Sequence, residues 1–323
     1  MAAITQSVGL FGVTGEVGRA FFDGLEAQPA FVGRLRLFAS AASGEETRVY
    51  RDRPIAIEVV EELAADRFDD LSEAILAVPA DVADELAAQL LQAGVRVWDV
   101  TGHLRAHPRA VPLSQATGAD LLIVCDDPLV ALCQPVLDAL AEQAPLTELA
   151  ITALSSVSLR GKAGVKELAA QTGNLLNGRG IEPTVWTQQI AFNVLLADGQ
   201  RDSSGRTARE RRIEKSFSAY APVIRVEQVV MPLFFGAMAQ LRWHTETAIT
   251  ADIDKLLSTL PHTQVTAAQA SELPSPVSDG ADHDGVSIAR VQVSDNRGSL
   301  WIIADPIRAG LVRPVLNVLM NLG

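Results

Sequence analysis

The sequence is poor in cysteine and in long apolar runs. Its two cysteines, Cys125 and Cys133, form no CxxC pair, which argues against a disulfide scaffold and against a structural zinc site. No run reaches the roughly 18 consecutive apolar residues that a membrane helix needs. The stretch from Met1 to Leu10 lacks the charged start and the long apolar run of a signal peptide. These absences predict a cytoplasmic protein without a membrane segment.

Positive charge is also scarce. The 27 Lys and Arg residues stand against 39 Asp and Glu residues, so the formal net charge is −12. Nucleic acids and anionic membranes bind basic faces, and neither is expected as a partner. What the chain does have is a globular composition over 323 residues, with 48% hydrophobic residues. This length exceeds what one core usually supports, and we expect two domains.

The first third of the chain alternates strand and helix signals. Apolar runs typical of buried strands precede segments with helical spacing, and this order predicts a parallel sheet covered by helices on both faces. The expected strands are Val8–Val13, Leu35–Ala39, Ile55–Val60, Glu73–Val78, Val95–Val100 and Leu121–Val124, and the expected helices are Gly18–Leu25 and Asp81–Ala93.

The rest of the chain has longer strand-like runs, which favour a mixed or antiparallel sheet. We expect a loop at Leu273–Gly285, a turn at Asp295–Gly298, and a solvated helix face at Arg209–Lys215. The expected helices are Pro128–Glu142, Arg160–Gln171 and Pro306–Leu322, and the expected strands are Leu146–Ser158, Val223–Met231, Met238–Thr245, Val286–Val293 and Ser299–Ala304.

A glycine-rich turn joins the first strand to the first helix. Gly12, Gly15 and Gly18 have the spacing GxxGxxG. The first two would permit a tight turn and close approach to a pyrophosphate, and the third would let the helix pack closely on the strand. The helix N-terminus would offer N–H groups to the phosphates. Because the spacing differs from GxGxxG, a turn that binds nothing is the alternative. The position at the start of an α/β run favours a nucleotide.

The end of the second strand bears on the choice of cofactor. No Asp or Glu stands there to hold a ribose 2′-hydroxyl. Ser40 and Ser43 offer hydroxyls to a 2′-phosphate, which suggests NADP. No Lys or Arg stands among them, however, and Glu45 and Glu46 would repel a phosphate. The preference between NADP and NAD therefore stays open. No His, Asp or Glu set has metal-ligand spacing, and no metal is expected.

Five segments carry a resemblance to a known family. They are Gly12–Gly18, Leu37–Ser40, Gly161–Leu168, Ile190–Val194 and Leu300–Gly310. In this order, and over nearly the whole chain, they resemble the aspartate-semialdehyde dehydrogenase family. The resemblance implies a Rossmann-like dinucleotide-binding domain (1–127 and 305–323), an α/β dimerisation and substrate domain (128–304), and a homodimer. The cofactor contacts that it implies come from Gly12, Thr14, Gly15, Glu16, Val17, Ser40 and Ser43.

The family reduces an acyl phosphate to an aldehyde with NADPH. A cysteine thiolate attacks, a histidine moves protons, and arginines bind the phosphate and the carboxylate. This chain departs from that pattern. The cysteine position corresponds to Pro128, the active-site glutamine to Ser155 and the histidine to Ala237. Val230 and Phe235 replace two arginines, which predicts an apolar cleft.

Further positions bear on whether the chain can bind the phosphate groups of its ligands. Ala42 stands in place of the arginine beside the cofactor serines, whereas Arg105 keeps a family phosphate-binding residue. Lys162 either touches a phosphate at a helix start or is a solvated residue. The losses together resemble the Usg-type branch of the family, which lacks the catalytic cysteine. We therefore expect a dimeric, nucleotide-binding protein without the family's activity.

The alternative is an active NAD(P)-dependent oxidoreductase of amino-acid biosynthesis that uses Cys125 or a different chemistry. Cys125 follows an apolar strand near the expected site. The neighbouring Asp126 and Asp127 would raise the thiol pKa and disfavour the thiolate. We therefore interpret Cys125 as a small buried hydrophobic residue, and we assign no catalytic residue.

Overall fold

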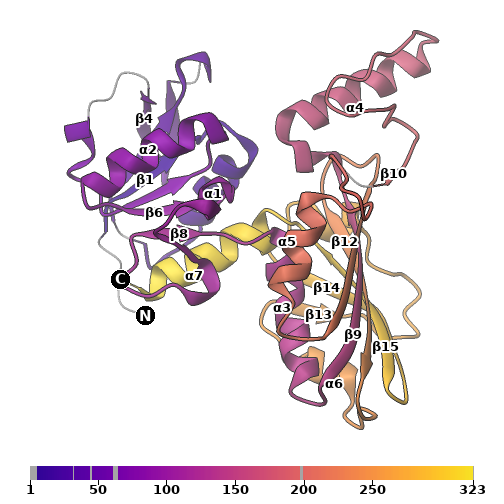
Figure 1. Cartoon of the computed structure of the whole chain (residues 1–323). Coiled ribbons are helices and arrows are strands. Elements are labelled where there is room, and N and C mark those ends of the chain that lie inside the picture. The colour runs from indigo at the N-terminus through magenta and orange to yellow at the C-terminus, as the bar shows by residue number, and fades with distance from the viewer. Residues whose placement is uncertain (1–5, 32, 44–45, 61–64, 197–198, 323) are drawn as a thin grey trace. The chain divides into compact units, whose positions relative to one another are not determined.

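The computed structural model describes residues 6–31, 33–43, 46–60, 65–196 and 199–322. The chain divides into two compact units (Figure 1). Unit 1 comprises residues 1–126 and 311–323, and unit 2 comprises residues 127–310. Within the described ranges, no helix is long and apolar enough to cross a membrane.

Unit 1 contains an eight-stranded sheet with the order β3-β4-β2-β1-β5-β6-β8-β7. All of its pairings are parallel except the one between β3 and β4. The doubly wound parallel sheet expected from the sequence is confirmed, with one antiparallel strand added at its edge. Its strands are β1 (Val8–Phe11), β2 (Leu35–Ala39), β3 (Thr47–Tyr50), β4 (Arg53–Val59), β5 (Glu73–Leu76), β6 (Arg96–Asp99), β7 (Ala110–Pro112) and β8 (Leu122–Val124).

The helices of unit 1 follow from this strand order. Helix α1 (Glu16–Glu26) leads from β1 to β2, and α2 (Ala80–Gln92) leads from β5 to β6 in the opposite direction. Right-handed crossovers therefore place α1 and α2 on opposite faces of the sheet. Helix α7 (Arg313–Asn321) packs against α1 where Gly24 has no side chain, since a Cβ there would lie 2.6 Å from Val312 and 3.1 Å from Leu316. The strand order reverses between β1 and β5, and folds of this kind bind ligands outside the carboxyl ends of the strands at such a reversal.

Unit 2 contains a seven-stranded mixed sheet with the order β10-β11-β9-β12-β15-β14-β13. The pairs β9–β11 and β13–β14 are parallel and the others antiparallel, as the long strand-like runs indicated. The strands are β9 (Leu146–Ser155), β10 (Leu195–Leu196), β11 (Val223–Val230), β12 (Ala237–Thr245), β13 (Thr263–Val265), β14 (Val286–Ser294) and β15 (Arg297–Ala304). The helices are α3 (Pro128–Ala141), α4 (Gly161–Leu176), α5 (Ala208–Ser216) and α6 (Ile253–Leu257).

Helices α3, α5 and α6 cover one face of this sheet (Figure 1). Their core joins Val136 and Ile213 to Leu149 and Trp243 of the strands. Helix α4 stands apart from them, near β10, and packs around Trp186 in a smaller apolar cluster (Figure 1).

Several expected bounds differ from the structure. The expected loop Leu273–Gly285 contains a π-helical turn at Pro276–Gly280, and the single terminal helix is a π-helical turn at Arg308–Val312 followed by α7. The turn between β14 and β15 is only Asp295 and Asn296, because β15 begins at Arg297. Short 3₁₀ turns lie at Ala41–Ser43, Ala65–Phe68, His103–Ala106, Leu113–Gln115 and Val157–Arg160.

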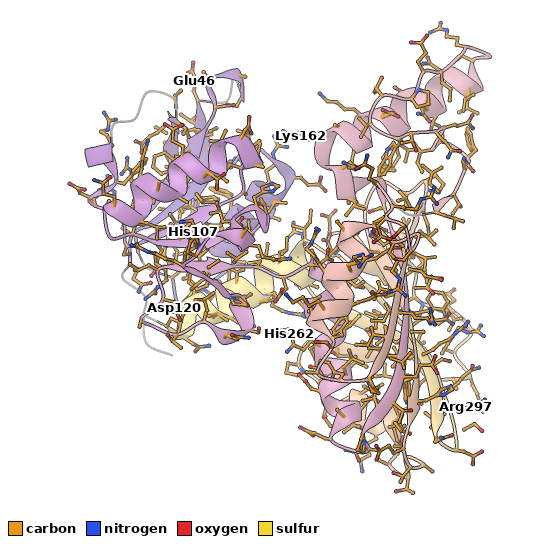
Figure 2. The ribbon with its side chains drawn as sticks, viewed as in Figure 1. Glu46, His107, Asp120, Lys162, His262 and Arg297 are labelled. Atoms are coloured by element: carbon orange, nitrogen blue, oxygen red, sulfur yellow. The ribbon has the colours of Figure 1, made fainter. Side chains whose placement is uncertain are left out.

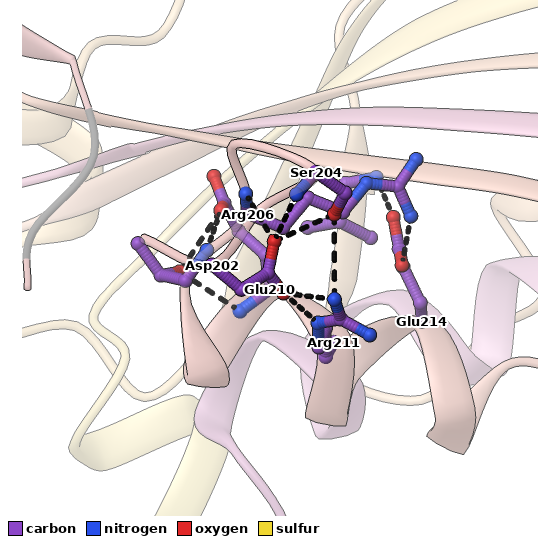
Figure 3. Close-up of polar contacts among 8 residues, drawn as sticks. Asp202, Ser204, Arg206, Glu210, Arg211 and Glu214 are labelled. Atoms are coloured by element: carbon purple, nitrogen blue, oxygen red, sulfur yellow. Dashed lines mark hydrogen bonds and ion pairs between the residues drawn. The ribbon is translucent and has the colours of Figure 1, made fainter. Parts of the chain in front are cut away.

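The loop before α5 is held by a polar network (Figure 3). Thr207 caps the helix by accepting from the Glu210 N–H, and the Glu210 carboxylate accepts from the Thr207 N–H in return, at 2.7 Å. Asp202 accepts from Ser204 and pairs with Arg211. Each of these contacts serves to cap α5 or to close the loop, so the network explains a helix start rather than a ligand site.

Candidate functional site

The glycine-rich turn follows β1 in unit 1, beside the point where the strand order reverses. Gly12 has φ +81°, and a Cβ there would lie 2.2 Å from the carbonyl oxygen of Ala77. The backbone N–H groups of Gly12 and Val13 donate to the carbonyl of Phe38 at 2.9 and 3.2 Å. These bonds fasten the turn to the end of β2, and only glycine fits position 12.

The start of α1 lies directly on this turn. A Cβ at Gly18 would be 2.2 Å from the Gly12 carbonyl oxygen, so the third glycine lets the helix approach the strand closely. Gly15 is the N-cap residue and brings no side chain to cap the helix. A Cβ at Gly15 would have the Gly12 oxygen, at 3.2 Å, as its sole neighbour within 4 Å among the described residues. The first turn of α1 thus offers its N–H groups to an anion from an open cradle.

The other expected cofactor residues belong to the same edge of the sheet. Thr14, Glu16 and Val17 are half-buried in the turn and the first turn of α1. Ser40 is exposed directly after β2, and its carbonyl accepts from the Ser43 N–H at 3.0 Å. The structure therefore gathers all seven expected cofactor residues at the carboxyl ends of β1 and β2. Glu46 is exposed beyond them (Figure 2), and Glu45 lies outside the described residues.

Arg105 lies at the carboxyl ends of β6 and β8 because a buried carboxylate shapes its loop. Asp99 is fully buried and accepts from the N–H groups of Thr101 at 2.9 Å and Leu104 at 2.7 Å. The Arg105 Nη2 atom donates to the Cys125 carbonyl at 2.6 Å, and it lies 3.8 Å from the Asp126 carboxylate. A cation thus stands at the carboxyl ends of β6 and β8, in a loop that Asp99 holds in place.

The two thiols are buried. Cys125 is 2% exposed, and burial raises the pKa of its thiol, with further raising by the charges of Asp99 and Asp126 against an opposing effect of Arg105. Burial also raises the pKa of the Cys133 thiol in α3. A thiolate nucleophile needs the opposite environment, exposed and electropositive.

In unit 2 three of the positions that the resemblance assigns to the family's active-site side chains form one row of the sheet. Val230 of β11 pairs with Ser155 of β9, and Ser155 pairs with Ala237 of β12. Val230 is fully buried, whereas Phe235, in the loop between β11 and β12, is 40% exposed. The row has one hydroxyl and no cation or imidazole.

Pro128 is the first residue of α3. Asp127 caps this helix by accepting from the Leu129 N–H at 3.1 Å. Gly310 packs on the proline ring, since a Cβ there would lie 2.8 Å from the Pro128 Cβ. Proline suits a first helical position because its missing N–H would have no helical partner. It offers neither a nucleophile nor a proton.

An ion pair that the sequence pattern did not reveal supports this helix start. The Arg209 Nε and Nη2 atoms donate to the Asp127 carboxylate at 2.5 and 2.9 Å. Burial opposes ionisation of Asp127, but the charge and hydrogen bonds of Arg209 outweigh it and lower the carboxyl pKa. The expectation of a solvated face at Arg209–Lys215 is wrong for Arg209 and Glu210, whose side chains are mostly buried.

Lys162 lies in the first turn of α4 and is exposed (Figure 2). Arg105 belongs to unit 1, so the two expected anion-binding residues do not share a unit. No group of three His, Cys, Asp or Glu side chains in the described part of the chain has the geometry to hold a metal ion.

Two family models match the chain. One is "Semialdehyde dehydrogenase, NAD binding domain", at residues 7–156, and the other is "Semialdehyde dehydrogenase, dimerisation domain", at residues 137–309. An aspartate-semialdehyde dehydrogenase 2 of Vibrio cholerae is 29% identical over 97% of this chain and 96% of its own. A USG-1 protein homolog of Pseudomonas aeruginosa is 30% identical over 94% of each chain.

Solved structures agree with these matches. The structure of a probable aspartate-semialdehyde dehydrogenase from Pseudomonas aeruginosa superposes with a TM-score of 0.89 at 28% identity, covering 99% of this chain and 98% of that one. The resemblance drawn from the five sequence segments is therefore confirmed, and the chain belongs to the semialdehyde dehydrogenase family, with its NAD-binding domain and its dimerisation domain.

Proposed function

We propose that this chain is a homodimeric, nucleotide-binding member of its family that does not reduce acyl phosphates, and that it acts as a binding or regulatory protein. One observation carries the proposal. The row Val230, Ser155 and Ala237, together with Pro128 at the start of α3, contains no thiol, imidazole or guanidinium.

The chemistry explains why this matters. Attack on an acyl phosphate needs a thiolate, and collapse of the intermediate needs a proton donor that titrates near neutrality. Two anionic groups on the substrate also need cationic partners. Catalytic residues act as a unit, so losing all of them removes most of the rate enhancement. The buried Cys125, with its raised pKa, supplies no substitute.

The proposal that the chain binds a nucleotide rests on how well the glycine-rich turn suits a pyrophosphate. The open cradle at Gly15 and the N–H groups of α1 suit a pyrophosphate, and Thr14 and Ser40 lie beside them. A bound NADP or NAD would supply hydride chemistry, while the chain would bind and orient it. We also propose a homodimer formed through the dimerisation domain. A cytoplasmic location fits two cysteines that are both free.

Calorimetric titration of the purified protein with NADP and with NAD tests the first part. The variant Gly15→Val is the matching perturbation: its backbone, at φ −72° and ψ 167°, is extended, and its side chain would enter the cradle with the new Cβ 3.2 Å from the Gly12 carbonyl oxygen. We expect micromolar binding to the native chain and at least a tenfold loss in the variant. Absence of binding to either nucleotide would contradict nucleotide binding.

The activity is tested separately, with aspartate semialdehyde, phosphate and each oxidised nucleotide, while NAD(P)H absorbance is followed. We expect no turnover, and steady turnover that Gly15→Val abolishes would establish the oxidoreductase alternative. Light scattering after gel filtration gives the mass in solution, where a monomer at micromolar concentration would contradict the homodimer.

A further inference from the structure

Arg48 reaches from the edge strand β3 to the glycine-rich turn. Its Nη1 atom donates to the Val13 carbonyl at 3.0 Å, although 35 residues separate the two in the chain. The guanidinium carbon lies 5.2 Å from the centroid of the Phe22 ring. Phe22 is 4% exposed in α1, so the cation is held between a buried ring and the turn.

The turn that Arg48 contacts is bonded to the end of β2. The Val13 N–H donates to the Phe38 carbonyl in β2, and the chain reaches Ser40 two residues later. Arg48 thus contacts the turn that is bonded to the end of β2, the strand that Ser40 follows, and no Lys or Arg lies between Ser40 and Arg48 in the sequence. Motif spacing in the sequence does not predict this cation, because Arg48 belongs to a separate strand, β3.

The end of β2 is where doubly wound domains distinguish the two nicotinamide cofactors. An acidic residue there accepts from the 2′-hydroxyl of NAD, and an arginine nearby binds the 2′-phosphate of NADP. Here β2 ends at Ala39 and is followed by Ser40, so no carboxylate stands at its end. A guanidinium forms a planar fork of five donors, which suits a backbone carbonyl and a phosphate together.

We propose that Arg48 recognises the 2′-phosphate of NADP and gives this chain a preference for NADP over NAD. The inference rests on the proposed nucleotide-binding function and goes beyond it by assigning the specificity to one residue. Ser40 and Ser43 add hydroxyl donors beside the same phosphate. The exposed Glu46 carboxylate opposes phosphate binding, which makes a positive charge from Arg48 the more important.

The test is the affinity of Arg48→Gln for four probes: NADP, NAD, adenosine 2′,5′-bisphosphate and 5′-AMP. Glutamine keeps an N–H donor but loses the charge. We expect the dissociation constants of NADP and of the bisphosphate to rise about tenfold or more, since hydrogen bonds between charged groups are the strong ones. Those of NAD and 5′-AMP should change less than about twofold.

Arg53→Gln is the matched control, because it makes the same charge change in the same β-hairpin. Arg53 is exposed at the hairpin tip, next to Arg51, whose guanidinium donates to the carbonyls of Phe31 and Gln28 at the far end of α1. The eleven residues of α1 separate that tip from the turn. We expect all four probes to bind Arg53→Gln as they bind the native chain.

The variant Arg48→Lys distinguishes a loss of phosphate recognition from a folding defect. It keeps the charge and the aliphatic stem over Phe22 and should retain part of the preference for NADP. Equal losses for NADP and NAD in Arg48→Gln would show that Arg48 only braces the turn, and this would overturn the inference. A native chain that binds both nucleotides equally would also overturn it while leaving the proposed function intact. A native chain that binds neither would overturn both.

Discussion

The Asp127–Arg209 pair gives the sharpest test of how unit 2 is held together. The side chains are only 10% and 17% exposed, and Arg209→Met would leave the Asp127 carboxylate buried without its cation. Removing one partner of a buried ion pair costs 3–5 kcal/mol. Because some solvent reaches both groups, we expect a loss of about 3 kcal/mol for Arg209→Met, and a similar loss for Asp127→Asn.

The double variant separates the ion pair from the helix cap. Asparagine at position 127 still accepts from the Leu129 N–H, and with Arg209→Met neither member of the pair carries a charge. We expect the double variant to lose about 2 kcal/mol less than the sum of the single losses, which is a normal coupling for groups in contact. Urea unfolding followed by tryptophan fluorescence measures each value, since Trp186, Trp243 and Trp301 belong to unit 2.

The pH dependence of unfolding in acid gives an independent measurement of the Asp127–Arg209 pair. The folded pKa of Asp127 is lowered, so the pair stabilises unit 2 above the ordinary aspartate pKa of about 3.9 and loses that stabilisation as the pH falls through the folded value. Arg209→Met should therefore unfold with a weaker pH dependence on the acid side than the native chain. Additive single losses below about 1 kcal/mol would refute the reasoning, because they are the behaviour of an exposed ion pair.

Three further predictions follow from other features. Gly18→Ala should destabilise unit 1 by about 2 kcal/mol, measured by thermal unfolding, because the new Cβ would overlap the Gly12 backbone; a neutral result would contradict the close approach. Cys125 should resist iodoacetamide at neutral pH in the native chain and react after unfolding, whereas rapid native labelling would indicate a thiolate. Aspartyl phosphate should fail to saturate the protein in calorimetry, since Val230 and Phe235 supply no cation; saturable binding would show that the cleft is not apolar.

Much of unit 1 was predictable because its central strands are buried on both faces. All four residues of β1 and all five of β2 are buried, and such strands appear in the sequence as continuous apolar runs. Strand β3 has no such signal. Only Tyr50 of its four residues is buried, since β3 lies at the edge of the sheet. The short α6 was missed for a related reason, as five residues are too few for a helical period to show.

In the candidate site, features set by neighbouring residues were predictable from the sequence, whereas contacts between residues far apart in the chain were not. The glycine spacing is local, and it predicted both the tight turn at Gly12 and the close packing at Gly18. The contacts of Arg48 and Arg209 span 35 and 82 residues. The charge pattern around Arg209 indicated a solvated helix, because periodicity records which residues share a face and not what the face meets.

The discontinuity of unit 1 has a consequence for the order of assembly in the cell. During synthesis the chain emerges from the N-terminus, and domains tend to fold as units. Residues 311–323 complete unit 1, and Val312 and Leu316 cover α1 at Gly24. Unit 2, at 127–310, is therefore fully translated before unit 1 has its last helix. The dinucleotide fold reaches its final packing last, although most of its residues are made first.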